Sequence, residues 1–248
     1  MNYEPLYLAF LGLAGLAGST IGAISGFGGG LLVTPFLVPV VGITGVVPVM
    51  TVAMIIGNLT RFSVYRAHIE PRFIGTLSLA VIPGIVVGTT IYEMLSPKLV
   101  GIALGGFLIA TIPLRRLFGK RPVKLSTVGI AAAGFGFGLV TGATTGAGVI
   151  LLSILLGLGV TGPALIATDA AMGVLVNVTK VVMFGSLSVL DSEQVMLGLA
   201  LGVCMIPGAF CGRWIMNRIP LHIHVAAIEV LVAIIGVWFL YKSLTLPR

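Results

Sequence analysis

The fold of this chain is constrained most by a series of apolar stretches, each with few charged residues and most of them about twenty residues long. They fall at about 6–25, 27–41, 46–65, 73–94 and 98–117, and again at about 125–142, 146–160, 164–185, 194–215 and 222–242. A helix of about twenty apolar residues spans the hydrocarbon core of a bilayer. The pattern therefore predicts a helical bundle with about eight to ten membrane segments.

Composition indicates that lipid is the main solvent of this bundle. Hydrophobic residues make up 58% of the 248 residues and charged residues only 8%, and the mean hydropathy is +1.18. Soluble domains carry about 25% charged residues. We therefore predict an all-α integral membrane protein. In that setting the net charge of +7 is interpreted as an orientation signal rather than as a nucleic-acid surface.

The two halves of the chain resemble each other in the order of their motifs. Four pairs recur with offsets of 116 to 124 residues: Gly26–Gly30 with Gly142–Gly148, Gly42–Gly45 with Gly159–Gly162, Asn58–Arg61 with Asn177–Lys180, and Ile82–Gly88 with Ile206–Gly212. Such self-similarity indicates a duplication. We predict a first repeat over 1–114, a basic loop over 115–124 and a second repeat over 125–248, with about five membrane segments in each repeat.

The distribution of basic residues predicts the topology. The 115–124 loop carries five bases and no acid, so we place it in the cytoplasm. The 66–72 loop then also lies inside, whereas the acidic 186–193 loop and both termini lie outside. This arrangement inverts the second repeat relative to the first, as in many secondary transporters. The expected location is the inner cell membrane, with multiple crossings.

Glycine-rich breaks precede the two shortest segments. Segments 27–41 and 146–160 hold about 15 residues, fewer than a spanning helix needs. They are either short tilted helices or one arm of a hairpin that re-enters the membrane. Bare amides at such breaks can bind an anion, particularly at the start of a helix, which we expect near Leu31 and near Gly148. The candidate substrate-binding residues here are Gly28, Gly29, Gly30, Thr144, Thr145 and Gly146. Close packing of helices is the simpler explanation of the glycines.

Four polar residues within the apolar segments extend this candidate site. Asn58 and Asn177 hold matching positions, and each either joins helices through hydrogen bonds or lines a polar cavity. Arg61 and Lys180 follow one turn later. Because both stand near predicted helix ends, their side chains either snorkel to the interface or supply positive potential for an anion.

Two acids within the segments are candidates for proton coupling. Asp169 either relays protons, pairs with Lys180 or caps a helix start, and Glu229 lies inside the last segment. We expect no metal site, because no His/Cys cluster has ligand spacing. No cofactor motif or enzyme signature is present in the sequence, so we do not expect an enzyme.

Several of these motifs carry a family resemblance. The run Gly26-Phe27-Gly28-Gly29-Gly30, Pro35 shortly after it, the repeated Asn-x-Thr-(Arg/Lys), and Pro83-Gly84 with Pro207-Gly208 resemble the sulfite exporter TauE/SafE family, formerly domain of unknown function 81. The resemblance covers essentially the whole chain. It implies secondary transport of small sulfur-containing anions such as sulfite or sulfoacetate. The second half departs from the pattern, with Thr144 and Thr145 in place of glycines.

Together these observations and the resemblance predict a secondary membrane transporter, working as an exporter, of small sulfur-containing or organic anions such as sulfite, sulfoacetate and sulfonates. Alternating access would arise from rocking one repeat against the other. A non-transporting membrane scaffold subunit and an anion channel are the alternatives. The expected partners are the anionic substrate and the bilayer, without nucleic acid. The sequence leaves open the exact substrate, the direction of transport, the coupling ion and whether the chain forms a homodimer.

Overall fold

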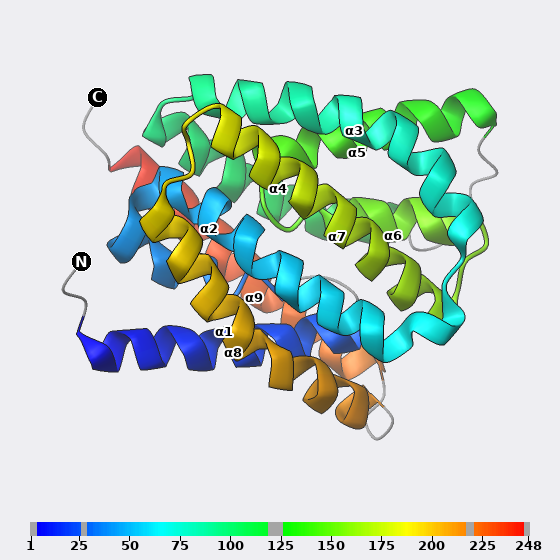
Figure 1. Ribbon diagram of the computed structural model, residues 1–248, viewed down its shortest axis with the longest axis horizontal. Coiled ribbons are helices and arrows are strands. Elements are labelled where there is room, and N and C mark those ends of the chain that lie inside the picture. The colour runs from blue at the N-terminus through cyan, green and yellow to red at the C-terminus, as the bar shows by residue number, and fades with distance from the viewer. Residues whose placement is uncertain (1–3, 26–28, 119–125, 217–220, 246–248) are drawn as a thin grey trace.

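The computed structural model describes residues 4–25, 29–118, 126–216 and 221–245. These residues form nine α-helices and no strand (Figure 1). The helices are α1 (Pro5–Ser25), α2 (Thr34–Tyr65), α3 (Pro71–Met94), α4 (Pro97–Phe118), α5 (Thr127–Ala143), α6 (Gly148–Gly157), α7 (Gly162–Ser186), α8 (Ser192–Met216) and α9 (Leu221–Leu244), with a 3₁₀ turn, η1 (Arg66–His68), after α2.

The helices have the length and surface of a membrane bundle. Five of those in the described residues, α1, α2, α3, α7 and α8, are long and apolar enough to cross a membrane. Large apolar side chains cover their outward faces; for example, Leu79 of α3 is 81% exposed and Met196 of α8 is 71% exposed. Water would penalise such a surface, whereas lipid does not. The predicted all-α integral membrane class is confirmed.

Two half-length helices lie at the positions where short segments are expected. Helix α2 is interrupted at Gly42, whose φ of 70° and ψ of 173° separate Thr34–Val41 from the longer helix that follows. Helix α6 has 10 residues, about 15 Å at 1.5 Å per residue, which is half of the hydrocarbon thickness. Gly159, with φ 84°, separates α6 from α7 in the same way.

The first half-length helix begins later than we predict from the sequence. Residues 29–33 form turns, and the helix starts at Thr34 rather than near Leu31. Pro35 explains the start, because proline lacks an N–H and fits the first helical turn. The described turns therefore extend past the glycines to Val33, three residues further than expected.

Small residues allow the outer helices to pack in close pairs. Helix α3 lies along α5 and helix α1 along α8, at opposite edges of the bundle in Figure 1. An added Cβ at Gly84 of α3 would overlap the backbone of α5 at Phe135, and one at Gly208 of α8 would overlap the backbone of α1 at Leu16. The two Pro-Gly motifs found in the sequence therefore lie where two helices approach backbone to backbone.

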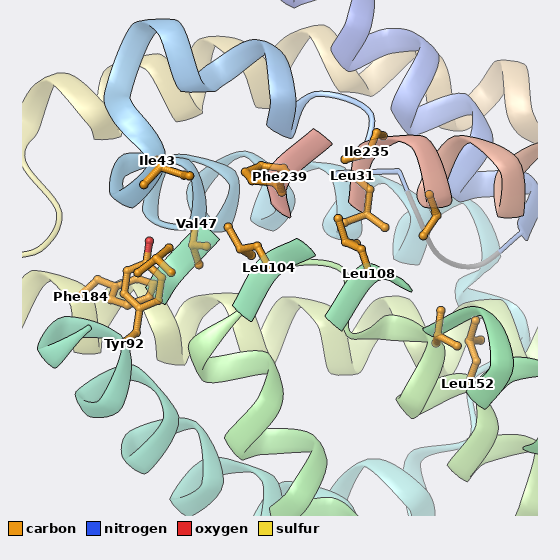
Figure 2. Close-up of a cluster of buried hydrophobic side chains, with 13 residues drawn as sticks. Leu31, Ile43, Val47, Tyr92, Leu104, Leu108, Leu152, Phe184, Ile235 and Phe239 are labelled. Carbon is orange, nitrogen blue, oxygen red and sulfur yellow. The ribbon is translucent and has the colours of Figure 1, made fainter. Parts of the chain in front are cut away.

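The long part of α2 and helix α7 pack together in the middle of the molecule and run in opposite directions. Tyr65, at the end of α2, is buried against Ile166 and Ala167 near the start of α7. At the other end, Phe184 of α7 joins Ile43 and Val47 from the start of the long part of α2 in one apolar cluster (Figure 2). The turn after α2 and the turn after α7 therefore lie at opposite ends of this central pair.

Candidate functional site

A cavity of about 90 Å³ lies between the central helices and the two breaks. A water molecule needs about 10–15 Å³ of such volume, so the cavity has room for several waters or one small anion. Nearly all of the predicted substrate-binding residues line it, together with Asp169. They are Gly29, Gly30, Asn58, Arg61, Thr144, Thr145, Gly146, Asn177 and Lys180. Charged and amide side chains from both halves of the chain therefore meet in one cavity.

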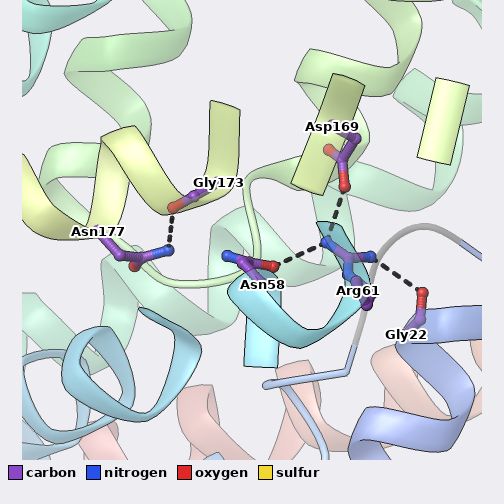
Figure 3. A network of polar contacts seen from close by, with 6 residues as sticks. All are labelled: Gly22, Asn58, Arg61, Asp169, Gly173 and Asn177. Carbon is purple, nitrogen blue, oxygen red and sulfur yellow. Dashed lines mark hydrogen bonds and ion pairs between the residues drawn. The ribbon is translucent and has the colours of Figure 1, made fainter. Parts of the chain in front are cut away.

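Three of the acceptors that hold Arg61 in this cavity are described residues (Figure 3). Its guanidinium donates to Asp169 Oδ2 at 2.9 Å, to Asn58 Oδ1 at 2.8 Å and to the carbonyl of Gly22 at 3.0 Å. The side chains of Arg61 and Asp169 are only 8% and 5% exposed. A buried guanidinium is tolerated when a carboxylate and further acceptors surround it. Asp169 therefore pairs with Arg61, and the predicted alternative of a pair with Lys180 is wrong.

Lys180 is buried, and its described partners include no carboxylate. The residue is 2% exposed, and its Nζ donates to the backbone carbonyl of Thr144 at 2.9 Å. It also lies 5.7 Å from the centre of the Phe184 ring. Among the described residues no acidic side chain forms an ion pair with it. Thr144 ends α5, so the ammonium lies where the negative end of a helix dipole favours a cation.

Snorkelling is therefore the wrong interpretation of both cations. Arg61 is 7% exposed and Lys180 is 2% exposed, so neither side chain reaches a solvated interface. Each instead reaches from the centre of the bundle to the end of a helix in its own half, Arg61 to Gly22 of α1 and Lys180 to Thr144 at the end of α5. Both positions place positive charge beside the cavity.

The amides and hydroxyls of the site are partly engaged within the protein. Asn177 Nδ2 donates to the carbonyl of Gly173 in its own helix at 2.7 Å, as Figure 3 shows. The hydroxyl of Thr144 donates to the carbonyl of Val140 at 2.7 Å. The predicted role of the Thr144 hydroxyl as a donor to substrate is therefore not available in this arrangement, because its single proton is already in use.

The two breaks meet beside the cavity. Gly146 has a φ of 86°, and an added Cβ there would overlap the side chain of Leu31 from the first break. On the other break, Gly29 lies against the backbone of α1 at Gly18 and Gly22. The backbone of Gly146, Ala147 and Gly148 lines the cavity at the N-terminus of α6, whose first N–H groups have no helical partner. This end of α6 carries partial positive charge.

Some predicted residues lie elsewhere or outside the described part of the chain. Gly28 lies outside the described residues, as does most of the basic 115–124 loop. Glu229 is a half-buried residue of α9 and is not among the described residues that line the cavity. Of the two acids considered for proton coupling, only Asp169 contributes to this cavity.

Further residues of the cavity do not emerge from the sequence reasoning. Ser19 and Thr141 line it from α1 and α5, and Met54, Gly173 and Met205 line it from the neighbouring helices. The two hydroxyl residues could have been found as polar side chains close before the glycine breaks. The methionines and Gly173 carry no such signal, because apolar and small residues occur throughout the segments.

Comparison with known proteins places the chain in a family. The profile described as sulfite exporter TauE/SafE matches residues 11–239, which is nearly the whole chain and includes every described residue that lines the cavity. No significant match was found among curated proteins or among solved structures. The resemblance seen in the glycine-rich and Pro-Gly motifs is thereby confirmed. The chain is a membrane protein of the sulfite exporter TauE/SafE family.

Proposed function

We propose that the protein is a secondary transporter of small sulfur-containing or organic anions, such as sulfite, sulfoacetate and other sulfonates. The observation that carries this proposal is the buried Lys180, which lines the central cavity and has no carboxylate partner among the described residues. A buried cation without a counter-ion is unfavourable in a bilayer. A bound anion would supply the missing charge.

The backbone around the cavity supports the same charge preference. The N-terminus of α6 and the glycines of the two breaks offer N–H groups, which suit sulfonate and sulfite oxygens. The cavity volume of about 90 Å³ suits an anion with few heavy atoms rather than a large organic molecule. The family name points to sulfite, and the geometry is compatible with any small oxyanion.

The two ends of the central helix pair support a carrier over a channel. Tyr65, Ile166 and Ala167 cover one end, and Phe184 with Tyr92, Ile43 and Val47 covers the other. Each of these two apolar contacts joins residues from both halves of the chain. A tilt of one half against the other would therefore separate the contact at one end of the pair and leave the contact at the other end intact. A channel would need a continuous path. A non-transporting scaffold would not need charged side chains at its centre, whereas Arg61, Asp169 and Lys180 line this cavity.

Flux measurements with the purified protein in liposomes test the proposal. We expect protein-dependent uptake of at least one of sulfite, sulfoacetate and methanesulfonate, with saturation by the substrate and competition among the anions. A pH gradient of either sign, compared with none, reports whether protons are coupled. Liposomes without protein provide the background. Absence of flux for every anion, with the protein shown to be folded and inserted, would contradict the proposal.

A further inference from the structure

The two cations of the cavity differ in their surroundings, although the sequence places them at matching positions. Asp169 lies eight residues before Asn177, and the residue eight positions before Asn58 is Met50. The acid therefore has no counterpart in the first half. As a result Arg61 has a carboxylate at 2.9 Å, whereas Lys180 has only a carbonyl and an aromatic ring as described partners.

We propose that Asp169 sets the charge selectivity of the site, so that the transporter prefers anions with one negative charge over those with two. This inference rests on the proposed function and extends it. Arg61 and Lys180 supply two positive charges to the lining and Asp169 removes one, which leaves a net charge of one positive among the described residues that line the cavity. A singly charged anion neutralises the cavity. A doubly charged anion, such as sulfate or sulfoacetate at neutral pH, leaves an excess negative charge out of water. Among the proposed substrates, hydrogensulfite and monosulfonates are therefore expected to be preferred over sulfoacetate.

The geometry also says where the charge of the substrate lies. Three acceptors already engage the guanidinium of Arg61, and one of them is a carboxylate. The ammonium of Lys180 has three protons, and its one described hydrogen-bond acceptor is the carbonyl of Thr144. The anion is therefore expected to pair with Lys180 near the N-terminus of α6, while Asp169 neutralises the charge of Arg61.

Methanesulfonate and sulfate provide matched probes, because they have the same number of heavy atoms and differ by one charge. In liposomes at neutral pH, the wild-type protein should transport methanesulfonate at a rate at least about ten-fold above that of sulfate. The free-energy cost of burying one uncompensated unit charge is larger than a ten-fold difference in rate requires. Asp169→Asn should reverse or abolish that preference by releasing the charge of Arg61. The amide oxygen of asparagine still accepts a hydrogen bond from Arg61, which favours folding.

A rescue experiment separates charge from structure. Lys180→Gln should lose methanesulfonate transport about ten-fold or more, because the lining becomes neutral. Adding Asp169→Asn to Lys180→Gln should restore methanesulfonate transport, since Arg61 then supplies the one uncompensated charge. Lys242→Gln, at an exposed position of α9, removes one positive charge away from the cavity and should leave the ratio unchanged. Binding of both probes to detergent-purified protein by calorimetry checks each variant independently of flux.

Three results would overturn the inference while leaving the proposed function intact. These are wild-type transport of sulfate as fast as methanesulfonate, an unchanged ratio in Asp169→Asn, and a folded double variant that stays as inactive as Lys180→Gln. Failure of the wild-type protein to move any of the anions would instead contradict the proposed function itself. The two failures are therefore distinguishable in one series of liposome measurements.

Discussion

Arg61 and Asp169 illustrate how a charged pair is maintained inside a bundle surrounded by lipid. The ion pair joins α2 to α7, and Asn58 and the end of α1 add further acceptors. Removal of one partner would leave the other charge buried without compensation. Replacement of both partners by apolar residues of similar size should lower the stability less, because no charge then remains buried.

A double-mutant cycle on this pair is the first prediction. Asp169→Leu alone should destabilise the protein by about 3–5 kcal/mol, and Arg61→Met alone by a similar amount. The double variant should be more stable than either single variant. Reversible unfolding in mixed micelles gives the free energies, and additive effects of the two substitutions would contradict the assigned ion pair.

Two tyrosines allow a comparison of buried hydroxyls. The hydroxyl of Tyr65 is buried and has no hydrogen-bond partner among the described residues, whereas that of Tyr92 donates to the carbonyl of Thr44 at 2.6 Å. Tyr65→Phe should therefore leave stability unchanged or raise it. Tyr92→Phe should lower it by about 1 kcal/mol. Thermal unfolding in detergent measures both, and a greater loss for Tyr65→Phe would show that its hydroxyl has a partner.

The residues of the site could be predicted from their types, but their contacts could not. An Asn, a Lys or an Arg within an apolar segment is conspicuous because burial is unfavourable, and such residues line the cavity here. The partner of Asp169 could not be chosen, since Arg61 is 108 residues away in the chain. Closeness to a helix end favours snorkelling when only the sequence is considered, but η1 and α7 cover the end of α2.

At the level of helices, glycine determines how closely the outer pairs approach. Gly84 and Gly88 of α3 lie against Gly138 and Gly142 of α5, and their backbones come within van der Waals contact. Lipid offers no hydrophobic drive for this association, so close packing and backbone contacts must stabilise it. Gly75 belongs to the same helix, and a Cβ added there would have no neighbouring atom within 4 Å.

Paired substitutions in α3 test this packing. Gly84→Ala should destabilise the protein by about 1–3 kcal/mol, because the new methyl group would force α3 away from α5. Gly75→Ala should be neutral or stabilising by up to about 1 kcal/mol, because alanine favours a helix. Melting temperatures in detergent compare the two. A Gly84→Ala protein that melts at or above the temperature of Gly75→Ala would rule out the close contact.

Helix positions are predictable from the sequence because apolar runs leave few alternatives in lipid. The segment predicted at 194–215 corresponds to α8 (Ser192–Met216), and the segment predicted at 73–94 corresponds to α3 (Pro71–Met94). The segment expected at 27–41 is the exception, since turns occupy 29–33. Hydropathy does not distinguish a turn from a helix where apolar residues follow a run of glycines, and Pro35 favours a helix start at Thr34.

For the whole molecule, the helix contacts suggest a two-fold relation between the halves. If α1 corresponds to α5 and α3 to α8, the close pair of α3 with α5 becomes the close pair of α8 with α1. Helix α4 packs on α9, and α2 packs on α7. The two-fold relation would exchange the two helices within each of these pairs. We propose that the halves are inverted repeats. The antiparallel course of α2 and α7 is the geometry that such an inversion requires.

Accessibility labelling tests the inverted arrangement in a membrane. Cys204 and Cys211 are free and exposed, so both are first replaced by serine. Single cysteines are then introduced as Ala67→Cys, in the turn after α2, and Ser192→Cys, at the start of α8; both residues are exposed. Because basic residues flank the first turn and acids the second, we expect Ala67→Cys to lie in the cytoplasm and Ser192→Cys outside.

An impermeant maleimide should therefore label the Ser192→Cys protein in intact cells and the Ala67→Cys protein only after permeabilisation. The cysteine-free background reports non-specific labelling, and transport by each variant shows that the fold is retained. Labelling of both from the same side would require α2 and α7 to enter the membrane in the same direction. Their buried contacts at Tyr65 with Ile166, and at Phe184 with Val47, could not then coexist across one bilayer.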